Sequence, residues 1–246
     1  MNGEYPGYIA KRVRTTNDSA TLPTVIDTLL PSITNMATKQ IFILGHGTNG
    51  WIGNHDNSAY LRASDVSQAL KNTYSKTNLE AQNPYRFVFI DGCSTASGPE
   101  WRRAFGIYPI DVDNQGQAKR NKTGLQAYVG WEKAVSLGMN RADYTTLDVK
   151  ITEAGIKTLQ TFYVNWMGGF SVKNCIDIAS QRGVPNQLPF PVPGNESVTI
   201  LIEGQPYTHK FTTSKIYIVG YPGLRVNGVD SSLNPDRTYA APKNTE

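Results

Sequence analysis

Two short runs of the sequence are wholly apolar, and they constrain the fold more than any other feature. The runs are Ile41–Leu44 and Phe87–Ile90, and each has the length of a β-strand. A third strand is predicted at Leu125–Val129. Strands without polar alternation, separated by helices, are typical of a sheet covered on both faces. The sequence therefore predicts an α/β sandwich with a mainly parallel sheet over residues 1–185.

Helices and one further strand are predicted around these runs. Apolar residues recur at helical intervals in segments 21–39, 65–73, 151–166 and 172–181. Pro31 should kink or split the first of these helices. Gly7–Thr15 is predicted to be a strand, and the Gly- and Asn-rich residues 48–62 are predicted to be a loop.

The pattern changes after a proline-rich loop at 184–197. Residues 198–203, 207–212 and 215–220 are predicted to form consecutive antiparallel strands. They either extend the first sheet or form a small subdomain. Residues 186–246 are therefore interpreted as a C-terminal β extension, and the polar end of the chain as a surface tail.

Composition excludes several classes of protein. The 246 residues include two cysteines and three histidines, too few for a disulfide framework or a familiar zinc site. The net charge is only +4, and the basic clusters do not alternate with aromatic residues as a nucleic-acid platform would. We therefore expect no metal, no cofactor and no nucleic-acid partner.

The location of the protein is constrained by what the sequence lacks. No run approaches the roughly 18 apolar residues of a membrane span, so no membrane association is expected. The N-terminal residues MNGEYPGYIAKRVR lack the apolar segment of a signal peptide. We expect a cytoplasmic protein, or a secreted mature form whose leader is not in this sequence.

Chemically distinctive side chains follow the predicted strands. His46, Cys93 and Trp131 come at or just after the ends of the three strands, where ligands bind in open α/β sheets. Neighbouring strands would place His46 beside Cys93, as a Cys-His dyad requires. The N–H groups of Gly47 and Cys93 could then form an oxyanion hole. Taken alone, each residue has a structural interpretation, and Cys175, inside a predicted helix, is assigned to packing.

The two strand-end motifs resemble those of the caspase-like cysteine peptidases. IFILGHG (41–47) is similar to their apolar strand ending in His-Gly, and FVFIDGCS (87–94) to their strand ending in the catalytic cysteine. The Asp-x-Cys form is closest to metacaspases, and the chain is also similar to bacterial CHAT, clostripain and gingipain domains. His46 lies 47 residues before Cys93, near the roughly 50 of a caspase-type pair. The resemblance covers about residues 7–182.

The resemblance implies a fold and a set of roles. The fold would be a caspase-like three-layer sandwich, mainly parallel, with C-terminal antiparallel strands. Cys93 would be the nucleophile and His46 the general base or acid, with Gly47 and Cys93 as oxyanion donors. Asp91 would select Arg or Lys before the cut, or would instead cap the following turn. Trp131 would wall the substrate pocket, or would pack against Trp166 or its neighbours.

Three functions remain open at this point. The first is a cysteine endopeptidase that cleaves a peptide or protein after Arg or Lys. Arg120 and Lys122, in the loop 106–123, are candidate self-cleavage sites. The second is a non-catalytic caspase-like scaffold or regulator, favoured because Ser-Thr-Ala follows Cys93 where metacaspases have His-Ser-Gly, and because the usual first strand and helix are missing. The third is a flavodoxin-like nucleotide- or phosphate-binding domain with GHGTNG (45–50) as its phosphate loop.

Overall fold

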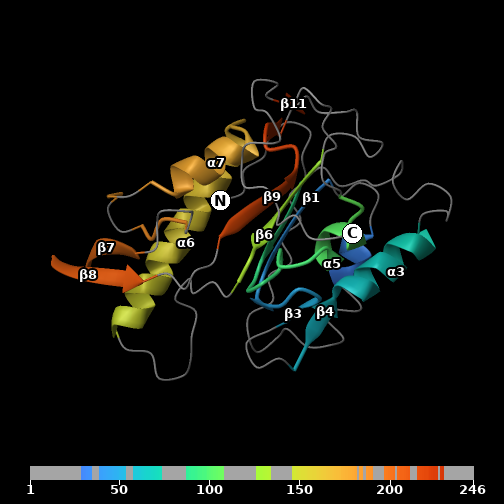
Figure 1. Cartoon of the computed structure of the whole chain (residues 1–246), viewed down its shortest axis with the longest axis horizontal. Helices are drawn as coiled ribbons and strands as arrows, with labels where there is room; N and C mark the ends of the chain where they lie inside the picture. Colours follow the sequence, from blue (N-terminus) through green and yellow to red (C-terminus); the bar gives the residue numbers. More distant parts are fainter. Residues whose placement is uncertain are drawn as a thin grey trace.

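A four-stranded sheet forms the centre of the computed structural model (Figure 1). The structure describes residues 29–34, 39–53, 58–73, 87–107, 126–133, 146–181, 183–184, 187–190, 197–202, 204–210, 215–226 and 228–229. The strands in spatial order are β1 (Gln40–Leu44), β5 (Phe87–Asp91), β6 (Ala127–Trp131) and β9 (Ile216–Gly220). The first three are parallel, and β9 runs antiparallel to β6. The prediction of a mainly parallel sheet is confirmed.

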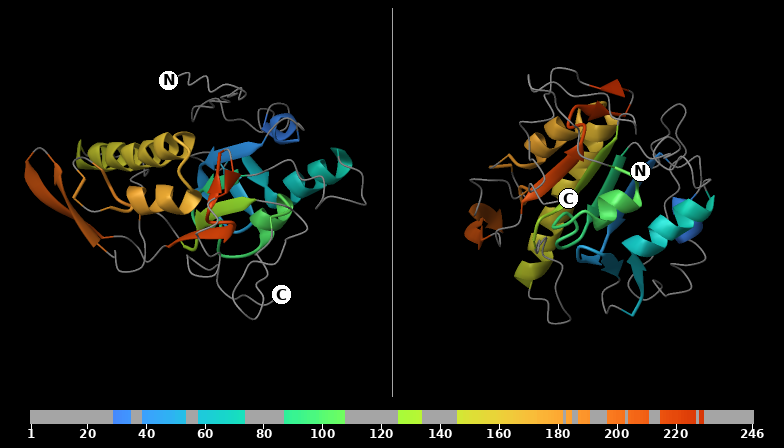
Figure 2. Two further views of the ribbon diagram at one scale, coloured as in Figure 1. Left: turned by 90° about the horizontal axis from the view of Figure 1, so that it is seen from above. Right: turned by 45° about the vertical axis from the view of Figure 1, so that its right-hand side comes forward.

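Helices lie on both faces of this sheet. One face carries α6 (Thr146–Met167) and α7 (Val172–Ala179), on the left in Figure 1. The other carries α3 (Ala63–Thr73) and the short α5 (Glu100–Ala104), on the right in Figure 1, and Figure 2 shows the same order from above. The short α2 (Leu30–Ile33) joins the second group through Ile33.

The interior strand β5 is apolar because both of its faces are buried, whereas β1, at the edge of the sheet, is only partly covered. Phe87 and Phe89 of β5 pack with the α6–α7 layer, and Val88 and Ile90 pack with the α3–α5 layer. Every residue of β5 is buried. A strand covered on both sides has no position for a polar, solvent-facing residue, which explains the absence of alternation.

The region 48–62 is not the loop that its composition predicts. β2 (His46–Gly47), β3 (Trp51–Gly53) and β4 (Tyr60–Arg62) form a small antiparallel sheet there. Ile52 and Leu61 pair across β3 and β4, and both are buried in the core beside α3. Alternation over three residues is too short to stand out among the Gly and Asn residues, so the sequence pattern missed these strands.

The C-terminal strands divide between two sheets. β7 (Ser197–Ile202) and β8 (Gln205–Lys210) form a hairpin that projects beyond α6 in Figure 1. β9 does not continue that hairpin among the described strands but pairs along its whole length with β6. β10 (Leu224–Arg225) and β11 (Gly228–Val229) form a short pair. Leu224 is fully buried, so this part of the expected surface tail contributes to the core.

The predicted helices at 65–73, 151–166 and 172–181 are present with shifted ends. Of the predicted helix 21–39, the described residues 29–34 and 39 contain only α2, and Pro31 lies in its first turn instead of kinking a longer helix. α6 is longer than the predicted 151–166, and α7 begins as predicted behind Ser171, whose hydroxyl oxygen accepts a hydrogen bond from the Asn174 N–H. Among the described helices, none is long and apolar enough to cross a membrane. The predicted strand Gly7–Thr15 and residues 108–123 of the candidate self-cleavage loop lie outside the described residues.

Phe162 on α6 provides a test of the packing between α6 and the sheet. Its side chain is fully buried, and its ring packs against Phe87, Phe89 and Phe190. Phe162→Ala should lower the free energy of unfolding by about 3–5 kcal/mol, measured by urea denaturation. Val164→Ala is the control, because Val164 on the same helix is 61% exposed and its loss should matter by less than about 0.5 kcal/mol. Equal effects of the two substitutions would contradict this packing.

Candidate active site

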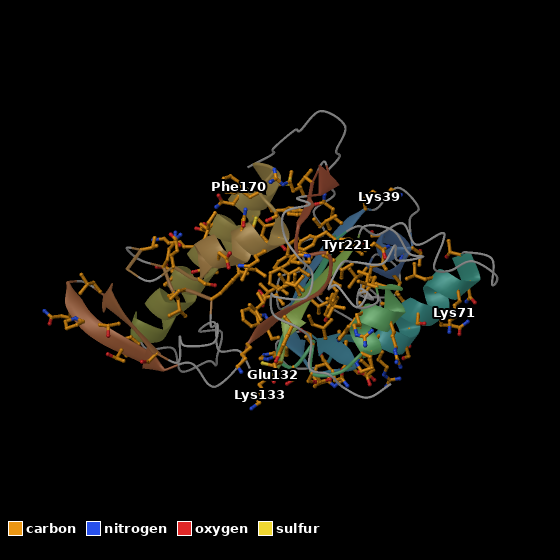
Figure 3. All side chains as sticks on the ribbon, turned by 45° about the horizontal axis from the view of Figure 1, so that its top comes forward. Lys39, Lys71, Glu132, Lys133, Phe170 and Tyr221 are labelled. Atoms are coloured by element: carbon orange, nitrogen blue, oxygen red, sulfur yellow. The ribbon has the colours of Figure 1, made fainter. Side chains whose placement is uncertain are left out.

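The strands that precede His46 and Cys93 end at the same level of the sheet. Leu44, the last residue of β1, pairs in register with Asp91, the last residue of β5. The Gly45 N–H then donates a hydrogen bond to the Asp91 carbonyl oxygen at 3.1 Å. Figure 3 marks the two ends of the sheet, with Lys39 before β1 at one end and Glu132 and Lys133 after β6 at the other. The His and Cys segments both leave the sheet at the latter, carboxyl end.

Gly47 and Gly92 bring these two segments into backbone contact. A Cβ atom added to Gly92 would lie 2.9 Å from the Gly45 carbonyl oxygen and 3.1 Å from the Gly47 Cα. A Cβ atom on Gly47 would lie 3.0 Å from the Gly92 Cα. Such distances leave no room for a side chain at either position. His46 on β2 and Cys93 in the turn after β5, each next to one of these glycines, are therefore on segments that meet, and both are partly exposed.

The N–H of Gly47 points away from β3 and is not used by the small sheet. The Thr48 N–H donates to the Trp51 carbonyl at 2.9 Å across the Asn49-Gly50 turn. Bonded and non-bonded pairs alternate along an antiparallel ladder, so the next pair, Gly47 with Ile52, is non-bonded. The β2–β3 pairing therefore leaves the Gly47 N–H on the outer edge of β2. This orientation is compatible with the expected role of Gly47 as an oxyanion donor.

Thr95 holds the turn that carries Cys93, and the sequence analysis missed it. Its side chain is fully buried, and its hydroxyl lies 2.8 Å from the Ile90 carbonyl oxygen and 2.9 Å from that of Gly92. The same hydroxyl oxygen accepts a hydrogen bond from the Trp131 N–H. The Thr95 carbonyl accepts a 2.6 Å hydrogen bond from the buried Tyr128 hydroxyl. A Thr just after a strand end often bonds to nearby backbone atoms in a turn, and this local signal could have identified Thr95.

The rest of the turn is also fastened to β6. The Ser94 N–H donates to the Lys133 carbonyl at 3.0 Å, and the Ala96 N–H to the Trp131 carbonyl at 2.8 Å. Ser94 has φ of 55°, the one non-glycine residue with positive φ among those the structure describes. A residue other than glycine, Asn or Asp seldom adopts this conformation, and such strain concentrates at functional sites. The turn therefore fixes the backbone on both sides of Cys93.

Asp91 and Trp131 bond to each other in the interior. The Trp131 Nε1–H donates to Asp91 Oδ1 at 2.6 Å, and the two side chains are 1% and 0% exposed. Capping of the following turn was one of the two roles predicted for Asp91. Its carboxyl group instead accepts the hydrogen bond from the indole. The Trp131 ring packs edge-on against Phe190, in the same buried cluster as Trp166. In the described conformation, neither side chain lies on an open pocket surface.

Burial raises the pKa of the Asp91 carboxyl group and of two groups on the neighbouring helices. It raises the pKa of Asp91 from 3.8 to about 7, and the hydrogen bond from Trp131 opposes the rise. Burial also raises the pKa of the Tyr163 hydroxyl, and the nearby Asp91 and Cys175 raise it further. Asp91 Oδ2 and the Tyr163 hydroxyl have no hydrogen-bond partner among the described residues. Burial raises the pKa of the Cys175 thiol to about 12, in keeping with its predicted packing role on α7.

The contact between Gly47 and Gly92 can be tested by substitution. Gly92→Ala should lower the free energy of unfolding by about 1–3 kcal/mol, because its Cβ would collide with backbone atoms of the facing segment. Gly50→Ala is the matched control, since Gly50 lies in the turn of the facing β2–β3 hairpin and has no atom within 4 Å of an added Cβ. Urea denaturation of both variants should show a loss only for Gly92→Ala. If both variants are as stable as the wild type, the close approach does not exist.

The buried carboxyl group should make stability depend on pH. The folded-state pKa of about 7 exceeds the ordinary value of 3.8, so the folded state keeps a proton that the unfolded chain has lost. Retention of this proton stabilises the folded state at low pH. Its contribution to the free energy of unfolding of the wild type is therefore lost as pH rises from about 4 to about 7, by at most about 1.4 kcal/mol per pH unit.

Asp91→Asn provides the measurement, because Asn keeps an oxygen that accepts the Trp131 hydrogen bond and does not titrate. Its stability relative to wild type should increase from pH 4.5 to pH 7 and stay constant above, in urea denaturation at each pH. A difference that does not change with pH would show that Asp91 ionises normally in the folded protein.

The arrangement as a whole combines a thiol and an imidazole on segments that meet at one end of the sheet, with the Gly47 N–H left outside the β2–β3 pairing. Among the described residues, no group of three or more His, Cys, Asp or Glu side chains could hold a metal ion. GHGTNG enters a β-hairpin and not the helix that a phosphate-binding loop requires. Comparison of the chain with protein-family models, with curated proteins and with solved structures finds no match.

Proposed function

We propose that this chain is a caspase-like cysteine endopeptidase in which Cys93 is the nucleophile and His46 its acid–base partner. The observation that carries the proposal is the contact of Gly47 with Gly92, because it joins the segments of the two side chains at the carboxyl end of the sheet. The strand order supports it as well, since parallel β1, β5 and β6 are followed by antiparallel β9, as the resemblance implies.

The chemistry follows from the groups at this sheet end. His46 takes the thiol proton, and the Cys93 Sγ attacks the scissile carbonyl carbon. The N–H groups of Gly47 and Cys93 stabilise the resulting oxyanion. His46 returns the proton to the leaving amine as the C–N bond breaks, and water then hydrolyses the thioester to restore the thiol. The fixed turn around Cys93 would keep the sulfur in place through both steps.

The substrate preference in this proposal is for Arg or Lys before the cut. A carboxylate in a protected site favours a cationic side chain, and Asp91 is two residues from the nucleophile. In the described conformation Trp131 occupies Asp91 Oδ1, while Oδ2 has no partner among the described residues. A basic side chain would therefore bind from the Oδ2 side.

The burial of Asp91 favours one alternative, a caspase-like scaffold or regulator without catalytic activity. The Asp91 carboxyl group is 1% exposed, so a substrate cannot contact it in the described conformation. The sequence Ser-Thr-Ala after Cys93 points the same way, because it departs from the metacaspase pattern. The two functions differ in whether any peptide is cleaved in a Cys93-dependent manner.

A panel of fluorogenic peptides with Arg, Lys, Asp or Ala before the cut separates these functions. Wild type should cleave the Arg or Lys peptides, and Cys93→Ala and His46→Ala should each reduce kcat/KM by at least about a thousandfold. Cys175→Ala is the matched control, because Cys175 is buried on α7 and should be dispensable for cleavage. Circular dichroism should show that all the variants remain folded.

Two outcomes would contradict the proposal. Cleavage by Cys93→Ala at the wild-type rate would remove the nucleophile from its assigned role. No cleavage of any peptide by the wild type, even after incubation long enough for self-processing, would favour the scaffold function.

A further inference from the structure

The hairpin that carries His46 has few backbone bonds of its own. β2 is two residues long, and the turn from β2 to β3 is closed by the Thr48 N–H, which donates to the Trp51 carbonyl at 2.9 Å. Strands this short form few ladder bonds and are marginally stable when isolated. The direction in which the His46 imidazole points therefore depends on what holds the β2–β3 turn from outside.

The segment that follows Cys93 makes contacts along this hairpin. A Cβ atom added to Gly47 would lie 2.9 Å from the methyl carbon of Thr95. A Cβ atom added to Gly98 would overlap the side-chain amide of Asn49, in the turn of the hairpin. The chain that leaves the Cys93 turn therefore runs along the hairpin from β2 to the turn.

Trp101, on the short helix α5, adds a hydrogen bond to these contacts. Its Nε1–H donates to the Thr48 carbonyl oxygen at 3.2 Å, two residues from His46. Its ring is fully buried, belongs to the same apolar cluster as Ile52 of β3, and stacks on Phe105 at a centroid distance of 6.3 Å. A ring packed at the density of a protein interior cannot turn freely, so its N–H stays directed at the hairpin.

We infer that Trp101 is a positioning residue for His46. Its indole N–H fixes the β2–β3 turn, and the fixed turn holds the imidazole opposite the Cys93 thiol. The inference rests on the proposed function, because it concerns how the two reacting groups of that function are kept together. Trp101 acts through the hairpin and takes part in no chemical step. The nucleophile and the group that positions its partner thus belong to one stretch of chain, residues 92–101.

The test compares Trp101→Phe with the same change at Trp166. Both side chains are buried, at 0% and 1% exposed, and each indole N–H donates one hydrogen bond. Trp166 on α6 donates to Gln40 Oε1 at 3.0 Å, and Gln40 begins β1 at the opposite, amino end of the sheet. The two substitutions remove the same group from equally buried positions, but only Trp101→Phe should release the hairpin. Urea denaturation would confirm that both variants are folded.

The first readout is the kinetics of peptide cleavage. Trp101→Phe should lower kcat by about ten- to a hundredfold and leave KM within about twofold, because it displaces a reacting group and not a substrate contact. Trp166→Phe should keep both constants within about twofold of the wild type. An equal fall in kcat in both variants would indicate a general effect of lost packing, and a change confined to KM would place Trp101 in substrate binding. Either result would overturn the inference.

The second readout does not require cleavage. NMR follows the His46 ring signals before and after iodoacetamide blocks Cys93, together with hydrogen exchange of the Thr48 N–H. The His46 signals should move on blocking in the wild type and in Trp166→Phe, and should move less in Trp101→Phe. The Thr48 N–H should exchange several-fold faster in Trp101→Phe, because the turn opens locally. Signals and exchange rates equal to those of the wild type in Trp101→Phe would overturn the inference.

A second replacement at position 101 keeps the test decisive if Trp101→Phe does not fold. 3-Benzothienylalanine retains the bicyclic ring and has sulfur in place of the N–H, so it removes the donor without leaving a cavity. It should produce the same fall in kcat and the same changes at His46 and Thr48. Wild-type behaviour of this variant would show that the hydrogen bond positions nothing.

The outcomes separate this inference from the proposed function. Suppose that the wild type cleaves no peptide and that the response of His46 to blocked Cys93 is lost in Trp101→Phe alone. The peptidase would then be rejected and the positioning role of Trp101 would stand. Cys93-dependent cleavage that Trp101→Phe leaves unchanged would do the reverse.

Discussion

The backbone contact between Gly47 and Gly92 is the constraint on which the rest of the site depends. β1 and β5 would run side by side without it, but the segments that leave them could then diverge. With no side chain on either glycine, the two segments meet within van der Waals distance, as the positions of their added Cβ atoms show. His46 and Cys93 are one residue away on either side. The proposed pairing of His46 with Cys93 depends on this close approach, which a side chain on either glycine would prevent.

The surrounding structure makes this contact rigid rather than incidental. Thr95 ties the Cys93 turn back to the end of β5 and across to β6, and its fully buried hydroxyl leaves it little freedom to move. The Asp91 carbonyl holds the His segment through the Gly45 N–H, while the Asp91 side chain holds Trp131. One residue thus connects the ends of three parallel strands. A substitution at Asp91 has to be judged with this structural role in mind, and for that reason Asn, which preserves the acceptor, is the informative replacement.

How far the sequence predicts this structure depends on the distance over which each signal acts. An apolar run such as Phe87–Ile90 indicates a strand that is buried on both faces. The central parallel strands and the helices around them could therefore be predicted from local sequence patterns. β2, β3 and β4 are too short to show a period, and the pairing of β9 with β6 joins residues far apart in the chain. The bond between Asp91 and Trp131 is equally non-local, because it spans 40 positions. The strand-end motifs located the candidate dyad, whereas nothing in them indicates the covered state of Asp91 or the position of Tyr163.

The central claim is that the Gly47–Gly92 contact brings the His46 imidazole and the Cys93 thiol together. The most direct measurement follows the ring resonances of His46 by NMR, assigned with His46→Gln, before and after iodoacetamide blocks Cys93. Mass spectrometry would confirm that Cys93, and not the buried Cys175, is modified. The account predicts that the His46 ring signals move when the thiol is blocked. Unchanged His46 signals in fully modified protein would contradict it.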